Sequence, residues 1–281
     1  MRVRLASWLK RLAGGQAGGS QAVTWTGDYH SWEEARGAGS GYDHPLILQR
    51  VREAAREVRS GRAAFERDAV VFPREEFNWP LIAQLFQVAA RSDGRLDVLD
   101  FGGSLGSVYY QHRRLLTELR SVSWRVVEQP AFVSAGREEF EDGRLTFHES
   151  IEAAMQSQQP NTVLVSSVLQ YVQDPRWLLD ALAACAAPFL LLDRTSVALE
   201  GPRRLTLQRT PEWIYEASYP AWFLDWDELL ASLQPRYRLV CWFRSAPDPP
   251  SARIEGGQLV GWRGALFEHV HPSPSPRVSP T

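Results

Sequence analysis

Short apolar runs alternate with helical patterns from residue 95 onward. Candidate strands lie at 96–101, 124–128, 144–148, 162–167 and 189–193. Helical patterns between them lie at 105–119, 131–141, 151–158 and 175–186. The runs "TVLVSSVL" and "FLLLD" are almost continuously apolar, which is typical of parallel strands buried on both faces. This alternation predicts a doubly wound, Rossmann-like α/β sheet.

The last part of the sheet follows a different pattern. A helix is predicted at 226–233, "WDELLASL", and two strands follow it at 237–243 and 259–270 with no helix between them. Two consecutive strands of this kind favour an antiparallel hairpin that closes the edge of a mostly parallel sheet.

Residues 22–94 form an N-terminal segment with helical patterns. Ser31 and Glu34 have the spacing of a capping box, and Asp43 and Asn78 each precede a helical pattern with proline in its first turn. We expect this segment to precede a domain at 95–270 that contains an insert at 196–226.

The two ends of the chain differ from the rest in composition. Residues 1–21 are basic and glycine-rich, and "MRVRLASWLKRL" indicates either a frayed terminus or, at most, a weak contact with a membrane surface. Residues 271–281 are rich in proline and serine, which predicts disorder.

Composition narrows the function classes. A formal charge of −2 gives no electrostatic case for a nucleic-acid partner. Cys185 and Cys241 form no CxxC pair, so neither a disulfide framework nor a metal site is expected. With no signal peptide or membrane span in the pattern, the sequence predicts a cytoplasmic protein.

The first strand of the domain ends in a glycine-rich loop, "LDVLDFGGSLGS" at 96–107. A P-loop is excluded because Gly106 is followed by Ser107 and Val108 instead of Lys and Ser or Thr. A dinucleotide fingerprint fits poorly because the glycines stand at 102, 103 and 106, and because Asp100 would repel a pyrophosphate at the helix N-terminus.

S-adenosylmethionine avoids the repulsion from Asp100, because it carries an ammonium and a sulfonium and no phosphate. We expect Asp100, Gly102, Gly103, Ser104 and Gly106 to bind it. Glu128 ends the second strand 22 residues past Gly106, where a carboxylate can accept ribose hydroxyls. A solvated charge at a strand end is the alternative for Glu128.

The loop pattern Asp100-x-Gly102-x-Ser104-x-Gly106 resembles the D/E-x-G-x-G-x-G loop of class I methyltransferases, with serine at the middle glycine. The chain also resembles, over about 25–268, a family of bacterial class I methyltransferases often linked to surface-polysaccharide loci. The blocks that carry this likeness are "WTGDYHSWEEA" (25–35), "VLDFGGSLGS" (98–107), "VVEQPAFV" (126–133), "SSVLQYVQDP" (166–175), "LLDRT" (191–195) and "ASYPAWF" (217–223).

The chemistry of transfer has several candidate residues. Ser166 and Tyr171 leave the fourth strand at the edge where such folds bind ligands, whereas we expect Ser167, Val168 and Leu169 to pack in the core. His148, Tyr171 and Asp193 are the candidate catalytic residues, with Asp193 preferred as acid or base. An ion pair with a nearby arginine is the alternative for Asp193. Glu149 is the candidate contact on the adenine side.

The insert at 196–226 is dense in aromatic residues, which suit a sugar or another ring-bearing acceptor. Pro220 between Tyr219 and Trp222 argues against a helix and favours an exposed turn that acts as a lid. The alternative is an aromatic cluster in the core.

The sequence leaves three alternative hypotheses for the function. The first is a metal-independent, S-adenosylmethionine-dependent methyltransferase acting on a small molecule or glycan precursor. The second is a non-catalytic S-adenosylmethionine-binding or scaffold protein of polysaccharide biosynthesis. The third, disfavoured by Asp100 and the glycine spacing, is a nicotinamide enzyme acting on nucleotide sugars.

Overall fold

The computed structural model describes residues 22–41, 45–156, 158–234 and 236–270. Its largest sheet has the strand order β11-β13-β8-β7-β4-β5-β6, with β12 paired to β13. The strands are β4 (Arg95–Phe101), β5 (Ser121–Val127), β6 (Leu145–His148), β7 (Thr162–Ser166), β8 (Phe189–Ala198), β11 (Tyr237–Arg244), β12 (Ala252–Arg253) and β13 (Leu259–His269). Strands β4 to β8 pair in parallel, and β13 is antiparallel to β8 and β11. The predicted doubly wound, mostly parallel Rossmann-like sheet, with its C-terminal antiparallel hairpin, is confirmed.

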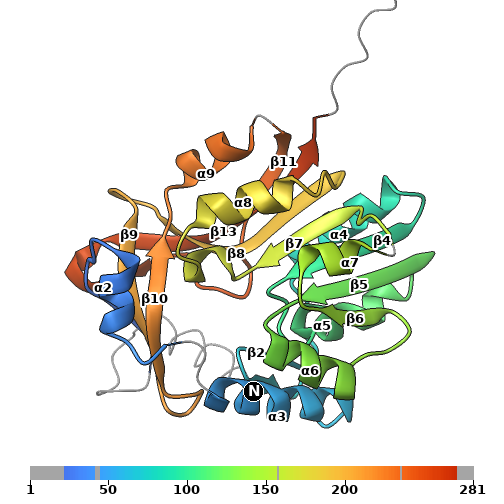
Figure 1. Cartoon of the computed structure of the whole chain (residues 1–281), viewed down its shortest axis with the longest axis horizontal. Helices are drawn as coiled ribbons and strands as arrows, with labels where there is room; N and C mark the ends of the chain where they lie inside the picture. The colour runs from blue at the N-terminus through green and yellow to red at the C-terminus, as the bar shows by residue number, and fades with distance from the viewer. Residues whose placement is uncertain (1–21, 42–44, 157, 235, 271–281) are drawn as a thin grey trace, which may run out of the picture.

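Helices cover both faces of this sheet (Figure 1). Neighbouring strand residues face opposite sides of the sheet. Val98 belongs to a core cluster with residues of helices α3 (Pro45–Arg59), α4 (Trp79–Ala90), α5 and α6, whereas Leu99 belongs to a cluster with residues of α7, α8 and α9. The helices of the domain are α5 (Ser107–Leu116), α6 (Pro130–Glu139), α7 (Ile151–Met155), α8 (Pro175–Ala183) and α9 (Trp226–Leu233), with short 3-10 turns η1 (Leu169–Tyr171) and η2 (Glu255–Gly257). Within the described ranges, no helix combines the length and apolar character needed to cross a membrane.

The order in which the chain adds strands to the sheet changes direction between the neighbouring strands β4 and β7. From β4 the chain builds outward through β5 to β6, and it then returns to place β7 and β8 on the other side of β4. Ligands of open α/β sheets bind at such a reversal, outside the carboxyl ends of the strands. The reversal therefore lies where β4 ends at Phe101 and β7 ends at Ser166.

The N-terminal segment contains the predicted helices together with three short strands that the pattern did not predict. The helices are α2 (Trp32–Gly37), α3 (Pro45–Arg59) and α4 (Trp79–Ala90), and the strands are β1 (Thr24–Thr26), β2 (Phe65–Arg67) and β3 (Val70–Phe72). Ser31 caps α2 and Asn78 caps α4, as predicted. Asp43 and the two end segments, 1–21 and 271–281, lie outside the described residues.

The insert and strand β1 of the N-terminal segment together form a three-stranded antiparallel sheet, with the order β1-β9-β10. Its strands β9 (Arg204–Thr210) and β10 (Ala217–Phe223) lie with α2 at one side of the molecule (Figure 1). The prediction of an exposed turn around Pro220 is wrong, because Pro220 lies within β10 and Tyr219 is only 3% exposed. Proline is tolerated there because β10 is an edge strand, on which one side of the backbone needs no partner.

Candidate functional site

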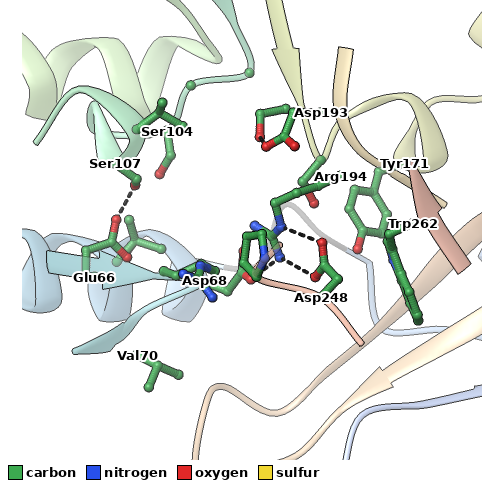
Figure 2. Close-up of a pocket in the computed structure, with 18 of the residues that line it drawn as sticks. Glu66, Asp68, Val70, Ser104, Ser107, Tyr171, Asp193, Arg194, Asp248 and Trp262 are labelled. Atoms are coloured by element: carbon green, nitrogen blue, oxygen red, sulfur yellow. Dashed lines mark hydrogen bonds and ion pairs between the residues drawn. The ribbon is translucent and has the colours of Figure 1, made fainter. Parts of the chain in front are cut away.

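A cavity opens at the carboxyl ends of β4 and β7, where the strand order reverses, and extends to the β1-β9-β10 sheet (Figure 2). Most residues that the sequence predicted for the site line it. They are Asp100, Gly102, Gly103, Ser104, Glu128, Ser166, Tyr171 and Asp193. Ser167, which was expected to pack in the core, also lines the cavity and has a left-handed φ of 60°.

Three predicted residues do not line this cavity. Gly106 instead caps α5 with a φ of 84°. A ring nitrogen of His148 lies 2.9 Å from the hydroxyl of Thr146, and the mostly exposed Glu149 lies 3.9 Å from Arg137. The geometry therefore brings neither His148 nor Glu149 to the other candidate residues.

The glycine-rich loop has no room for a side chain at two positions. A Cβ atom on Gly102 would lie 2.5 Å from Val168, and one on Gly103 would lie 2.5 Å from the Asp100 carboxylate. Only glycine fits these two positions. Ser104, at the middle glycine of the family pattern, adopts a φ of 56°, the left-handed conformation that glycine takes readily.

Asp100 is a buried carboxyl group on the cavity wall, 1% exposed. Its Oδ2 accepts a hydrogen bond from the indole N–H of Trp124 at 2.8 Å, whereas Oδ1 has no partner among the residues that the structure describes. Burial raises the pKa of Asp100 to about 7, with a smaller upward contribution from the nearby Glu128 charge. A buried acceptor left without a donor is costly, so this atom on the cavity wall is a candidate ligand contact.

Glu128 extends from the end of β5 toward the same loop. Its carboxylate accepts hydrogen bonds from the backbone N–H groups of Ser104 at 3.3 Å and Gln129 at 2.8 Å. Burial raises its pKa. These two bonds fix the carboxylate beside the glycine-rich loop, so the alternative of a solvated strand end is wrong.

A β-bulge brings Asp193 to the cavity. In the pairing of β8 with β13, Thr195 lies opposite Arg263 and Leu192 lies opposite Ala265, so Asp193 and Arg194 together face only Gly264. The strand continues to Ala198, beyond the end predicted from the apolar run. Bulges redirect side chains next to ligand sites, and this one places two charged residues at the cavity.

Asp193 is held by neutral hydrogen-bond donors. Its carboxylate accepts from the side-chain amide of Asn78 at 3.1 Å and from the hydroxyl of Ser166 at 3.0 Å. Burial raises its pKa to about 6. The alternative of an ion pair with an arginine is not seen among the described residues, where the neighbouring Arg194 pairs with Asp68 at 3.0 Å and with Asp248 at 3.2 Å (Figure 2).

A hairpin of the N-terminal segment contributes residues that the sequence did not reveal. Asp68 and Ala69 connect β2 to β3 with φ values of 52° and 64°, the backbone of a type I′ turn. Glu66 on β2 is 4% exposed and lines the cavity. The Asn-Gly or Asp-Gly signal that usually marks such turns is missing, so only the alternation in "FERDAVVF" could have indicated the hairpin.

His112 lines the cavity but is already engaged on both ring nitrogens. Nε2 accepts the backbone N–H of Asn78 at 3.1 Å, and Nδ1 lies 2.8 Å from the carbonyl of Val108. Burial lowers its pKa to about 4, so the ring is neutral at neutral pH. It connects α4 to α5 and is unsuited to act as a base.

Opposite the glycine-rich loop, neutral polar groups form a continuous network. The Gln208 side-chain oxygen accepts from the Trp25 indole N–H at 2.9 Å and from the Tyr171 hydroxyl at 3.0 Å. Its side-chain nitrogen donates to the Tyr219 hydroxyl at 3.0 Å, which lies 3.2 Å from the Thr210 hydroxyl. Burial raises the pKa of Tyr171, so this phenol stays protonated and is not a base. We call these five residues the hydroxyl wall.

Neither a protein-family model nor a curated protein sequence matches this chain. Similar solved structures include a magnesium protoporphyrin IX methyltransferase from Synechocystis PCC 6803 with bound S-adenosylhomocysteine, at 12% identity and a TM-score of 0.48, covering 82% of this chain and 96% of that one. Another is a Burkholderia thailandensis 1,6-didemethyltoxoflavin N1-methyltransferase, at 18% identity and a TM-score of 0.41, covering 83% of this chain and 95% of that one. A third is an amino pentose methyltransferase from Micromonospora echinaspora, at 13% identity and a TM-score of 0.43, covering 76% of this chain and 96% of that one. These values are low, so the function proposed below rests on the residues of this chain.

Proposed function

We propose that the chain is an S-adenosylmethionine-dependent methyltransferase that acts on a small-molecule acceptor. The observation that carries this proposal is the set of buried carboxyl groups at the carboxyl edge of the sheet. Within the described ranges, no arginine, lysine or histidine forms an ion pair with Asp100 or Glu128. Buried carboxylates without a cation favour a cationic ligand and disfavour a phosphate.

The residues present fit this donor. Gly102, Gly103 and Glu128 line the cavity, and in this proposal the glycine backbone contacts the amino-acid end of the donor while Glu128 accepts the two ribose hydroxyls. When bound, S-adenosylmethionine supplies a methyl group on a sulfonium, whose sulfur is a good leaving group. The protein's own task is then to align the acceptor, exclude water and, where needed, take up a proton.

The acceptor is proposed to bind between Asp193 and the hydroxyl wall. Aromatic faces with polar tips suit a sugar or another ring, including a glycan precursor. Asp193 is the proposed proton acceptor, since it is ionised above a pH of about 6 and is oriented by Asn78 and Ser166. A role in surface-polysaccharide synthesis and a cytoplasmic location belong to the same proposal.

A second candidate function is non-catalytic binding of S-adenosylmethionine. It is favoured by the engagement of Asp193 with three donors, because the Ser245 hydroxyl also lies 3.5 Å from its Oδ1. These protein donors occupy the oxygens that would otherwise take up a proton from an acceptor. Transfer of label from radiolabelled donor to a cell extract separates the two functions, since only the enzyme produces a labelled product.

Thermal and calorimetric titration with S-adenosylhomocysteine tests the proposal. Ligand at 100 times its dissociation constant should stabilise the folded chain by about 2.7 kcal/mol. NAD at the same concentration should give no shift, because Asp100 opposes a pyrophosphate. Absence of any shift with millimolar S-adenosylhomocysteine would reject the cofactor assignment.

A further inference from the structure

Glu66 is a buried carboxyl group from outside the main sheet that faces the glycine-rich loop. Its Oε1 accepts a hydrogen bond from the hydroxyl of Ser107, and its Oε2 accepts the backbone N–H of Ala69 at 3.2 Å. Figure 2 shows Glu66 joined to Ser107 on the same side of the cavity as Ser104. Both partners of this carboxyl group are neutral.

The hairpin that bears Glu66 is built to hold it there. Strand β2 packs against α5, which begins at Ser107. The guanidinium of the neighbouring Arg67 lies 5.5 Å and 5.4 Å from the ring centres of Phe65 and Phe72, and its charge offsets only a small part of the effect of burial on the pKa of Glu66. No ion pair joins Glu66 to a cation in the part of the chain that the structure describes.

A second buried group points to the same missing cation. The unpartnered Oδ1 of Asp100 belongs to the same cavity as Glu66. Removing two carboxyl groups from water without a cation is unfavourable, and both pKa values rise to about 7 through burial. A ligand cation in this cavity would offset that cost.

The position of Ser107 identifies which cation this is. The free N–H groups at the start of α5 favour an anionic group, and the donor carries its α-carboxylate on the same carbon as its α-ammonium. With the donor's α-carboxylate at the start of α5, its α-ammonium lies next to the Glu66 carboxylate, which is hydrogen-bonded to Ser107, the first residue of this helix. We infer that Glu66 binds the α-ammonium of the methyl donor, with Ser107 fixing the Glu66 carboxylate. This inference rests on the proposed function.

Two ligands separate this role from a structural one. S-adenosylhomocysteine carries the α-ammonium, whereas 5′-methylthioadenosine lacks the whole amino-acid end. In calorimetric titrations, Glu66→Gln should weaken S-adenosylhomocysteine roughly 10- to 100-fold, as expected for a hydrogen bond to a charged group, and leave 5′-methylthioadenosine unchanged. Ser107→Ala keeps the carboxylate and should show the same selectivity with a smaller loss.

Glu57→Gln is the matched control, because Glu57 is exposed and pairs with Arg62 outside the cavity. It should bind both ligands like the wild type. Equal loss of both ligands in Glu66→Gln, or no loss of either, overturns the inference. If Glu66→Gln does not fold, the selectivity of Ser107→Ala decides in the same way. Failure of the wild-type chain to bind S-adenosylhomocysteine would instead refute the proposed function.

Discussion

The two sides of the cavity satisfy their polar groups in opposite ways. On one side, the carboxyl groups of Glu66, Asp100 and Glu128, which we call the carboxyl wall, have only neutral partners, and one oxygen of Asp100 has none in the described structure. On the hydroxyl wall, by contrast, Gln208 donates to one neighbour and accepts from two others.

Because of this difference, we expect one wall to determine how tightly a ligand binds and the other to determine which ligand binds. The carboxyl wall gains most from a ligand that brings positive charge, so it should dominate the affinity for the proposed methyl donor. The hydroxyl wall is already hydrogen-bonded, and an acceptor gains there only by exchanging bonds of similar strength. Such a surface selects ligands by the positions of their hydrogen-bonding groups more than by the strength of the bonds they form.

The largest expected effect comes from removing the centre of the hydroxyl wall. Gln208→Leu leaves the Trp25 indole and the hydroxyls of Tyr171 and Tyr219 without their shared partner. We expect about 3 kcal/mol lower stability, because several buried polar groups lose a bond at once. Urea unfolding measures this loss, and titration of the folded variant should show unchanged S-adenosylhomocysteine affinity.

Gln258→Leu serves as the control for this substitution. Gln258 donates to the carbonyls of Glu200 and Pro202 in a surface loop, outside the cavity. It should cost only about 1 kcal/mol. If Gln208→Leu weakened S-adenosylhomocysteine binding in step with stability, the two walls would not be independent.

The next effect concerns the carboxyl wall. Glu128→Ala should weaken S-adenosylhomocysteine by roughly 1.5–3 kcal/mol, the range for hydrogen bonds to a charged group, while the chain stays folded. Calorimetric titration gives the affinity, and a thermal melt checks the fold. Unchanged affinity would mean that Glu128 only orders the loop through Ser104.

The carboxyl wall also predicts a pH dependence. The pKa of Asp100 is about 7 in the folded chain against an ordinary aspartate value of 3.8, so the folded state holds more protons between these values. This contribution to stability is present below about pH 4 and is lost as the pH rises through about 7. Stability of the ligand-free chain should therefore decline over that window, as urea unfolding at several pH values would measure.

Binding of a cation should have the opposite pH dependence. The donor favours ionised Asp100, so S-adenosylhomocysteine affinity should rise about tenfold from pH 6 to pH 8 for each carboxyl group of pKa about 7 that must ionise. Titrations at several pH values measure this slope. Asp100→Asn should reduce the slope, and a flat wild-type profile would show that no such proton is released.

The smallest effect is expected at Glu149, which lies outside both walls. Its side chain is 57% exposed and 3.9 Å from Arg137. An exposed pair of this kind contributes little, so Glu149→Ala should change S-adenosylhomocysteine affinity by less than about 0.5 kcal/mol. A larger loss in calorimetry would restore the predicted adenine-side contact.

The parts of the site that were predicted from the sequence depend on local signals. Continuous apolar runs located the parallel strands, and the turn after β4 located Asp100 and the glycines, because strand ends and left-handed turns are set by neighbouring residues. Glu128 followed from spacing along the chain. These features need no knowledge of long-range contacts.

The parts that were missed depend on contacts between distant segments. Strand β1 pairs with β9 across more than half of the chain, so nothing near Trp25 indicates its partner Gln208. Pro220 suggested a turn because an edge strand and a loop tolerate proline equally well. Glu66 was hidden because its turn, Asp68–Ala69, lacks glycine and asparagine.

The insert leaves and rejoins the domain at a single point. The backbone N–H of Ala198 donates to the carbonyl of Leu224 at 2.9 Å, and that of Leu224 donates to Ser196 at 3.0 Å. Because the two ends of the excursion are fastened to each other, its length and sequence can change without moving β8 or the glycine-rich loop. The join at 198 and 224 is thus the place at which the insert can be shortened or replaced with the least disturbance of the main sheet.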